Sequence, residues 1–235
     1  MIVIVASRYD GPAHRLNERW AGDGSCLFTP GDLSVSGWRY YPSDPLNSSG
    51  IIGGREIKQS EIHGVFSRLP WVWEGELVDI VSEDRAYVAA EMSAFFLCWL
   101  AGLTCPVLNR PTASCLTGPG WGREQWNSAA WKAGMRVQPV ERQGSLTASS
   151  MPASIDAATE AAKTTVTVVG GRCLGEADKT LLTQARRLAD LAKVDFLSVQ
   201  FSSAEADACF AGASACPDVV TDSAADAALS YLLRR

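Results

Sequence analysis

The chain has 235 residues, of which 47% are hydrophobic and 20% charged, a composition typical of a globular protein with one large domain or two small ones. Its 21 basic and 26 acidic residues give a net charge of −5, which disfavours nucleic acid and anionic membranes as partners because both attract clustered positive charge. The longest apolar run, 95–103, is too short to cross a bilayer. We therefore expect a cytoplasmic protein without a membrane or nucleic-acid partner.

The seven cysteines show no C-x-x-C spacing, and only two histidines, His14 and His63, accompany them. This pattern gives little support to a zinc or iron–sulfur site. The sequence therefore predicts reduced thiols and no bound metal.

The first 140 residues alternate between strand and helix patterns. The run MIVIVA (1–6) is apolar and β-branched, as expected for a strand covered on both faces. Further strands are predicted at 25–30, 50–57, 62–70, 105–109 and 137–140. A short helix is expected within 7–20, and longer helices at 83–101, capped by Ser82, and at 123–134. This order predicts an α/β fold with a Rossmann-like first domain over 1–140.

The remainder of the chain divides into a linker and a smaller unit. Residues 141–163 are rich in Ser, Thr and Ala and contain Gly and Pro, which is typical of a linker. After it, the patterns predict strands at 164–175, with a Gly-Gly turn, at 194–201 and at 208–218. They predict helices at 176–193 and 222–235. We expect a small α+β unit over 164–235.

The loop NRPTASCLTGPGWGREQW at 109–126 is the most distinctive stretch of the sequence. Gly118, Gly120 and Trp121 form a tight turn just before a helix, whose first residue is Arg123. Free N–H groups at a helix start favour an anion such as phosphate or carboxylate. The alternative is a structural Gly/Pro turn in which the tryptophan fills the core.

Three further polar residues end predicted strands. Asn109 and Arg110 follow the strand at 105–109, and Arg68 ends the strand at 62–70. An arginine can bind a carboxylate or phosphate of a ligand. For Arg110, the alternative is an internal ion pair with Glu83, Asp84 or Glu91. The ligand-binding candidates are therefore Arg68, Asn109, Arg110, Gly118, Gly120, Trp121 and Arg123. No catalytic residue is predicted.

Four stretches in order, SRLPWVWEGEL, DRAYVAAEMSAFFLCWL, CPVLNRP and GPGWGREQW, resemble the N-terminal part of RimK-like ATP-grasp proteins. The resemblance covers about residues 1–140. The segments VTVVGGRCLG, QARRLADLAKVDFLSVQF and CFAGASACPDVV are similar to the end of the same fold. The resemblance implies a pre-ATP-grasp domain followed by a remnant of the C-terminal half.

The sequence departs from that family where the nucleotide and metal would bind. Only 141–163 stands where a lysine-bearing subdomain and glycine-rich loop are expected. Gln200 stands where an acid is expected, and residues 211–214 supply neither the Glu nor the Asn of a magnesium site. The resemblance therefore implies a truncated, degenerate member that binds no ATP or Mg²⁺ unless a partner chain completes the site.

These observations leave three candidate functions. The first is a catalytically inactive protein that binds a small ligand or a partner protein in a biosynthetic or peptide-modifying pathway. The second is a subunit of an ATP-dependent carboxylate–amine ligase completed by another chain, and the third an enzyme that uses the 109–126 loop for other chemistry. Because the missing subdomain would uncover apolar sheet surface, we expect a homodimer, or a heteromer with a full-length ATP-grasp or pathway enzyme.

Overall fold

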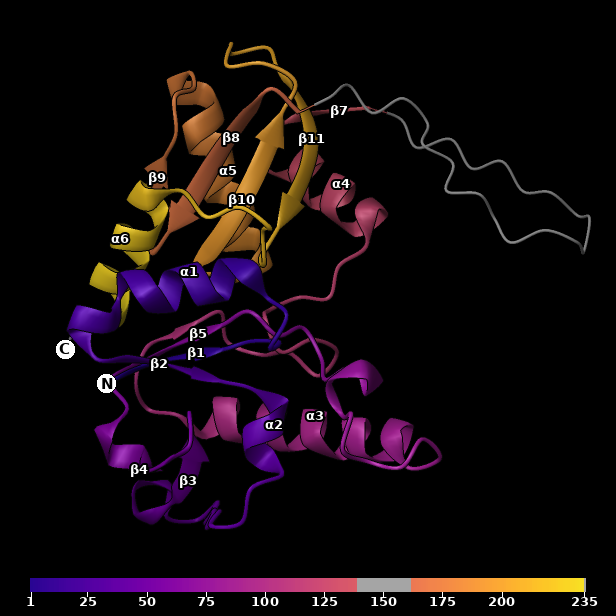
Figure 1. Ribbon diagram of the computed structural model, residues 1–235. Coiled ribbons are helices and arrows are strands. Elements are labelled where there is room, and N and C mark those ends of the chain that lie inside the picture. Colours follow the sequence, from indigo (N-terminus) through magenta and orange to yellow (C-terminus); the bar gives the residue numbers. More distant parts are fainter. Residues whose placement is uncertain (139–161, 235) are drawn as a thin grey trace, which may run out of the picture.

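Two β-sheets in two lobes form the framework of the computed structural model, which describes residues 1–138 and 162–234 (Figure 1). The first sheet is parallel and the second is largely antiparallel, so the protein is a mixed α/β fold, as the sequence predicts. The predicted linker at 141–163 lies almost wholly outside the described residues.

The first sheet has the strand order β2-β1-β5-β6. Its strands are β1 (Ile2–Val5), β2 (Ser25–Phe28), β5 (Gly64–Ser67) and β6 (Val107–Leu108). The four residues of β1 are all buried, because both faces of the sheet are covered. Val3, Val5 and Val65 face a core completed by α3 (Arg85–Gly102). The alternate residues Ile2 and Ile4 face α1 (Gly11–Arg19) instead.

Two predictions for this lobe need correction. The single strand predicted at 50–57 is a hairpin of β3 (Ser49–Ile52) and β4 (Arg55–Lys58). Gly53 and Gly54 adopt φ of 56° and 74°, a conformation that glycine accepts at little cost and that turns the chain back. Ser82 does not cap α3, because the helix starts two residues later than predicted, after Asp84.

A short helix α2 (Pro30–Leu33) follows β2.

The second sheet has the order β7-β11-β10-β8-β9. Its strands are β7 (Arg136–Val137), β8 (Thr164–Val169), β9 (Arg172–Leu174), β10 (Phe196–Phe201) and β11 (Cys209–Ser214). Its helices are α4 (Arg123–Lys132) and α5 (Lys179–Ala192), which lie on one side of the sheet (Figure 1). They cover the side that carries Val166, Val168, Leu197, Val199 and Phe201.

The second face of this sheet is only partly covered. Val169 and Phe196 join α1 and α6 (Asp222–Leu232) in a third core, which also includes Ile4 and Phe66 of the first sheet. The rest of the face carries the alternate residues of β8 and β10, of which Thr165 and Gln200 are exposed and Thr167 and Ser198 are buried. The uncovered part of the sheet is therefore polar, and not apolar as the sequence predicts for a sheet that has lost its covering subdomain.

Elements from both predicted domains, 1–140 and 164–235, pack together in the two lobes. α4 and β7 belong to the first of these ranges but pack in the second lobe, whereas α6 belongs to the second and packs on the first sheet. Within the described part of the chain, no helix is long and apolar enough to span a membrane.

Candidate functional site

The uncovered face of β8, β10 and β11 forms the floor of a cavity of about 580 Å³, a volume within the usual range of ligand pockets. Its walls come from the segment that follows β11. The lining residues are Thr165, Thr167, Ser198, Gln200, Gly212, Ala213, Ser214, Cys216, Pro217, Asp218, Val219 and Thr221. We refer to this space as the sheet cavity.

The strand register arranges the floor of the sheet cavity in two rows. Thr167, Ser198 and Ser214 lie opposite one another across the three strands and form the first row. The second row is Thr165, Gln200 and Gly212. The floor therefore presents hydroxyl groups and one carboxamide, which can both donate and accept hydrogen bonds.

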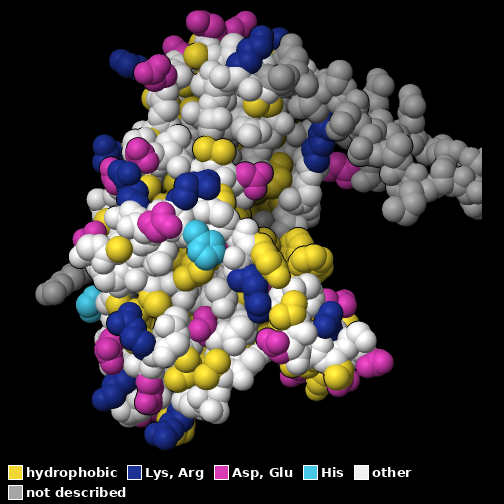
Figure 2. Space-filling model, in the orientation of Figure 1, with side chains coloured by type: hydrophobic (Ala, Val, Ile, Leu, Met, Phe, Trp, Pro, Cys, Tyr) yellow, Lys and Arg dark blue, Asp and Glu magenta, His cyan; other side chains and the backbone are white. Residues whose placement is uncertain are grey.

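The sheet cavity carries little charge. Among the described residues that line it there is no lysine or arginine, and the only carboxylate belongs to the exposed Asp218. Burial raises the pKa of the Cys216 thiol to about 11, so this group is neutral near pH 7. Figure 2 shows the corresponding part of the upper lobe as largely white, the colour of uncharged polar side chains and backbone. Such a surface suits a neutral ligand that makes hydrogen bonds.

Arg68 lies behind one wall of the sheet cavity. Its side chain is 3% exposed and forms an ion pair of 2.9 Å with Asp10. Nη2 also donates to the main-chain oxygen of Pro217 at 3.1 Å, while the thiol of Cys216 donates to the main-chain oxygen of Arg68. Nη1 is buried and has no partner among the described residues. Arg68 thus holds the segment after β11 against the first lobe.

Asn109 connects the two lobes. Its Oδ1 accepts hydrogen bonds from the main-chain N–H groups of Asp195 and Phe196, at 3.0 and 2.7 Å. Its Nδ2 donates to the main-chain oxygens of Phe196 and Thr117, at 2.8 and 3.3 Å. The side chain is buried, and its amide group makes four contacts within the protein.

Arg110 lies at the carboxyl end of α3, away from the sheet cavity. Its guanidinium donates to the main-chain oxygens of Leu103 and Cys105, at 3.0 and 3.1 Å. A cation at this position stabilises the unpaired carbonyls and the dipole of the helix end. The acceptors of these bonds are main-chain oxygens, and not the carboxylates of Glu83, Asp84 or Glu91 that the sequence offers as internal partners.

The glycine turn of the 109–126 loop lies between the lobes, beside the end of β11. Gly118 has φ of 113°, and a Cβ there would come within 3.1 Å of Val194. Gly120 and Arg123 are exposed, and Arg123 is the first residue of α4. Trp121 packs edge-on against Trp126 at 4.9 Å. It also borders a second hollow, of about 350 Å³, with Gln125, Lys132 and Leu191.

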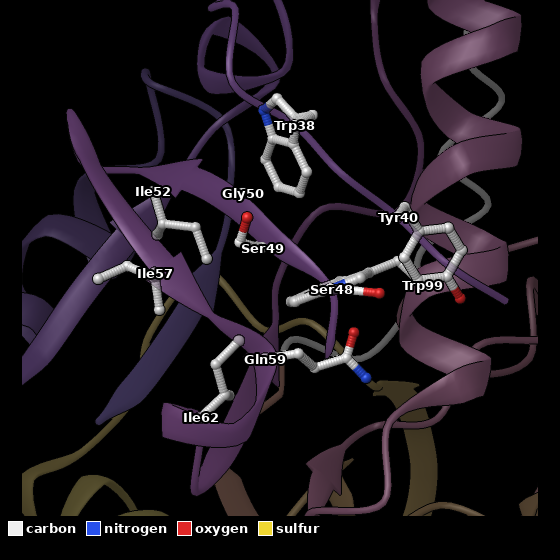
Figure 3. Close-up of a pocket in the computed structure, with 10 residues that line it drawn as sticks. All are labelled: Trp38, Tyr40, Ser48, Ser49, Gly50, Ile52, Ile57, Gln59, Ile62 and Trp99. Carbon is white, nitrogen blue, oxygen red and sulfur yellow. The ribbon is translucent and has the colours of Figure 1, made fainter. Parts of the chain in front are cut away.

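A third cavity lies in the first lobe, between the β3–β4 hairpin and α3 (Figure 3). Figure 3 shows the carboxamide of Gln59 reaching toward Ser48 and Trp99, and its buried Oε1 has no partner among the described residues. The cavity measures about 10 Å³, which is room for one water at most. It is too small for a ligand.

The structure thus disperses the residues that the sequence nominates. Arg68 and Asn109 join the lobes, Arg110 caps α3, Gly118 lies beside Val194 and Ala215, and Trp121 borders the second hollow. The floor of the sheet cavity is a candidate binding surface that contains none of the residues nominated from the sequence. Its signal was the alternation in TTVTVV and FLSVQF, where the polar residues lie on one face and the apolar residues on the other.

No family model and no curated protein matches this sequence. Solved structures do match. The macrocyclase MdnC of Microcystis aeruginosa, bound to its precursor peptide MdnA, matches with a TM-score of 0.71 at 11% identity, over 100% of each chain. The ATP-grasp ligase PsnB, complexed with a minimal precursor, Mg and ADP, matches with a TM-score of 0.63 at 15% identity, over 99% of this chain and 98% of that one.

A RiPP-associated ATP-grasp ligase of Chryseobacterium gregarium, in complex with ADP and a leader and core peptide, also matches. Its TM-score is 0.59 at 10% identity, over 92% of this chain and 89% of that one. At such low identity the likeness concerns the fold. This chain therefore shares the fold of these ATP-grasp ligases.

The residues that line the sheet cavity do not suit Mg²⁺ with a nucleotide. Mg²⁺ prefers charged oxygen ligands in octahedral geometry, and in the described residues no group of three or more acidic, Cys or His side chains could hold a metal ion. Phosphates are usually bound by Arg or Lys, and neither lines this cavity among the described residues. Gln200 and Gly212 face each other in the second row of the floor instead.

Proposed function

We propose that this chain is a peptide-binding protein with an ATP-grasp fold, which acts in a peptide-modifying pathway and does not itself catalyse ATP-dependent ligation. The observation that carries the proposal is the sheet cavity, whose floor is lined by hydroxyl groups and a carboxamide. The lining is suited to the carbonyl, N–H and hydroxyl groups of a peptide.

The proposed absence of ligation rests on the chemistry of the same floor. A ligase of this fold has to neutralise the phosphates that take part in the reaction, and a nearly uncharged surface gives them no cationic partner. The exposed carboxylate of Asp218 would repel a polyphosphate. A peptide without net negative charge meets no such repulsion.

A second candidate function is that of a subunit in an ATP-dependent ligase whose nucleotide site a partner chain completes. The exposure of Thr165 and Gln200 favours this alternative, because another chain could contact the floor and supply the missing cations and carboxylates. Both functions are compatible with a heteromer, and the first also with the expected homodimer. Light scattering across micromolar concentrations would measure the state of the isolated chain.

Calorimetric titration tests the proposed function. Peptides are selected from a random ten-residue display library on the purified chain, and each is then titrated beside Mg·ATP. We expect binding of selected peptides, weaker binding in a Ser198→Tyr variant whose ring fills the floor, and no ATP hydrolysis. Tight Mg·ATP binding with turnover by the isolated chain would refute the proposal. Binding of Mg·ATP only after a full-length ATP-grasp partner is added would favour the second candidate.

A further inference from the structure

Among the described residues, the outer edge of β11 is open over most of its length. On its inner side it pairs with β10 along its length, from Phe210 to Ser214. On its outer side the described residues provide only β7, which pairs with Cys209 and Phe210. The remaining residues, Ala211–Ser214, are half-buried and have no strand beside them among the described residues. Their outward N–H and C=O groups can pair with another extended segment.

This open edge has defined ends and borders the sheet cavity. β7 closes it at Phe210. At the other end the glycine turn approaches, since a Cβ at Gly118 would be 3.9 Å from that of Ala215. The gap between them spans four residues of β11, or about 13 Å at the usual rise of a strand. It can therefore pair with roughly four residues of an extended peptide.

The alternation of side chains links the edge to the sheet cavity. Gly212 and Ser214 lie on the cavity side of β11, whereas Ala213, whose backbone also borders the cavity, packs its side chain against the core that includes α4. A strand added beside β11 would point every second side chain to the cavity side as well. Those side chains would meet hydroxyl groups and the carboxylate of Asp218, with no Lys or Arg among the described lining residues.

We infer that the peptide of the proposed function binds as an added strand along the outer edge of Ala211–Ser214, with neutral or basic side chains directed to the sheet cavity. The inference rests on the proposed function and adds the binding mode and the charge of the ligand. Main-chain hydrogen bonds to β11 supply affinity, and the polar floor selects against acidic side chains.

The experiment uses a peptide selected from the display library on the full chain. Each backbone nitrogen of the peptide is methylated in turn, which removes one N–H at a time. Strand addition predicts that every second methylation weakens binding at least about tenfold, the loss expected for one buried hydrogen bond, while the intervening ones have little effect. Amide hydrogen exchange of Ala211–Ser214 should slow on binding to a similar degree.

Two variants at one position test the charge of the ligand. Gly212 faces the sheet cavity, and a Cβ there would meet only Oε1 of Gln200, at 3.4 Å. Gly212→Lys introduces a cation and should weaken binding of a lysine-containing peptide at least about fivefold, whereas Gly212→Glu, of similar size, should preserve or strengthen it. Equal thermal unfolding of the two variants establishes that both are folded.

The outcomes separate the two proposals. If peptides bind without a two-residue pattern in the methylation scan, or without protection of Ala211–Ser214, strand addition is wrong and the peptide-binding function stands. If both Gly212 variants change binding equally, the charge preference is wrong. If the library yields no binding peptide, the proposed function fails and the inference fails with it.

Discussion

Gln200 and Gly212 lie directly opposite each other on β10 and β11, and a Cβ at Gly212 would come to 3.4 Å from Oε1 of Gln200. A carboxamide and a glycine thus face each other on the floor of the sheet cavity. The resemblance to ATP-grasp proteins implies an acid at the position of Gln200 and a Glu or Asn within 211–214, so we expect the absence of a metal site to depend on these positions.

The first prediction is that metal binding can be introduced at this pair. The triple variant Gln200→Asp, Gly212→Glu and Ser214→Asn places two carboxylates and a carboxamide on facing strands. We expect it to bind Mn²⁺ with a dissociation constant of about 1 mM or lower, because hard cations favour such oxygen ligands. Electron paramagnetic resonance of free Mn²⁺ measures the binding.

The control for this prediction is Gln200→Asn, Gly212→Gln and Ser214→Asn, which has similar bulk without charge. We expect no Mn²⁺ binding by the control above that of the unmodified chain. If both variants are folded and bind Mn²⁺ equally, the floor of the sheet cavity is not a suitable metal site.

The second prediction concerns Asn109 as a connection between the lobes. Asn109→Ala leaves the main-chain groups of Asp195 and Phe196 without the hydrogen bonds that the amide makes. Unpaired buried polar groups are costly, so the variant should lose about 3 kcal/mol of unfolding free energy. Urea denaturation followed by tryptophan fluorescence checks this value.

Asn109→Asp is the matched control for shape. It retains the Oδ1 acceptor but loses the donor to Phe196 and buries a charge, so it should also be destabilised. A loss below about 0.5 kcal/mol in both variants would mean that Asn109 contributes little to holding the lobes together.

The third prediction concerns the ion pair of Arg68 and Asp10. Asp10→Asn leaves the guanidinium buried without its charged partner, which should cost about 3 kcal/mol or more of stability. The Asn side chain can still accept the N-cap hydrogen bond that Asp10 receives from Ala13. Thermal and urea unfolding measure the loss.

The double variant Asp10→Asn with Arg68→Met separates pairing from packing. Once the arginine is removed, no charge remains unpaired, so the double variant should be more stable than the sum of the two single losses predicts. Strict additivity would show that the two side chains do not depend on each other.

The fourth prediction follows from the pKa of the Cys216 thiol, which burial raises to about 11. Iodoacetamide reacts with thiolate, so Cys216 should be alkylated very slowly at pH 7 and roughly tenfold faster for each unit of pH up to that value. The thiol ionises at lower pH in the unfolded chain than in the folded protein. The unfolding free energy should therefore fall as the pH rises toward 11.

Mass spectrometry of the alkylated peptides measures this rate. Cys98 is exposed and serves as the reference in the same sample. Alkylation of Cys216 at pH 7 as fast as that of Cys98 would contradict the prediction and would make this thiol a candidate for chemistry in the sheet cavity.

The regular elements could be predicted from the sequence because their signals are local. The β-branched run of β1 and the apolar spacing of α5 depend only on neighbouring residues, and both elements form where predicted. The β3–β4 hairpin was missed because Gly53 and Gly54 were read as part of one strand, although their pairing signals a turn.

The site could not be predicted in the same way, because it depends on contacts between distant residues. Asn109 contacts Phe196, 87 positions later in the chain, and Arg68 contacts Pro217, 149 positions later. The residue type shows that a side chain can form hydrogen bonds or ion pairs, but it does not show which group it will contact. A polar side chain that could bind a ligand is equally suited to a hydrogen-bond partner inside the protein, so the sequence does not tell the two roles apart.

The position of α6 has a consequence for how the chain acquires its structure. This helix lies beyond residue 220, yet it packs on the face of the first sheet that carries Ile2 and Ile4. During synthesis only α1 can cover those early residues on that side until α6 has emerged. Contacts over such separations slow folding, and a shared core links the two lobes in one transition. We therefore expect a slow folder with cooperative unfolding, dependent on chaperones while it is made.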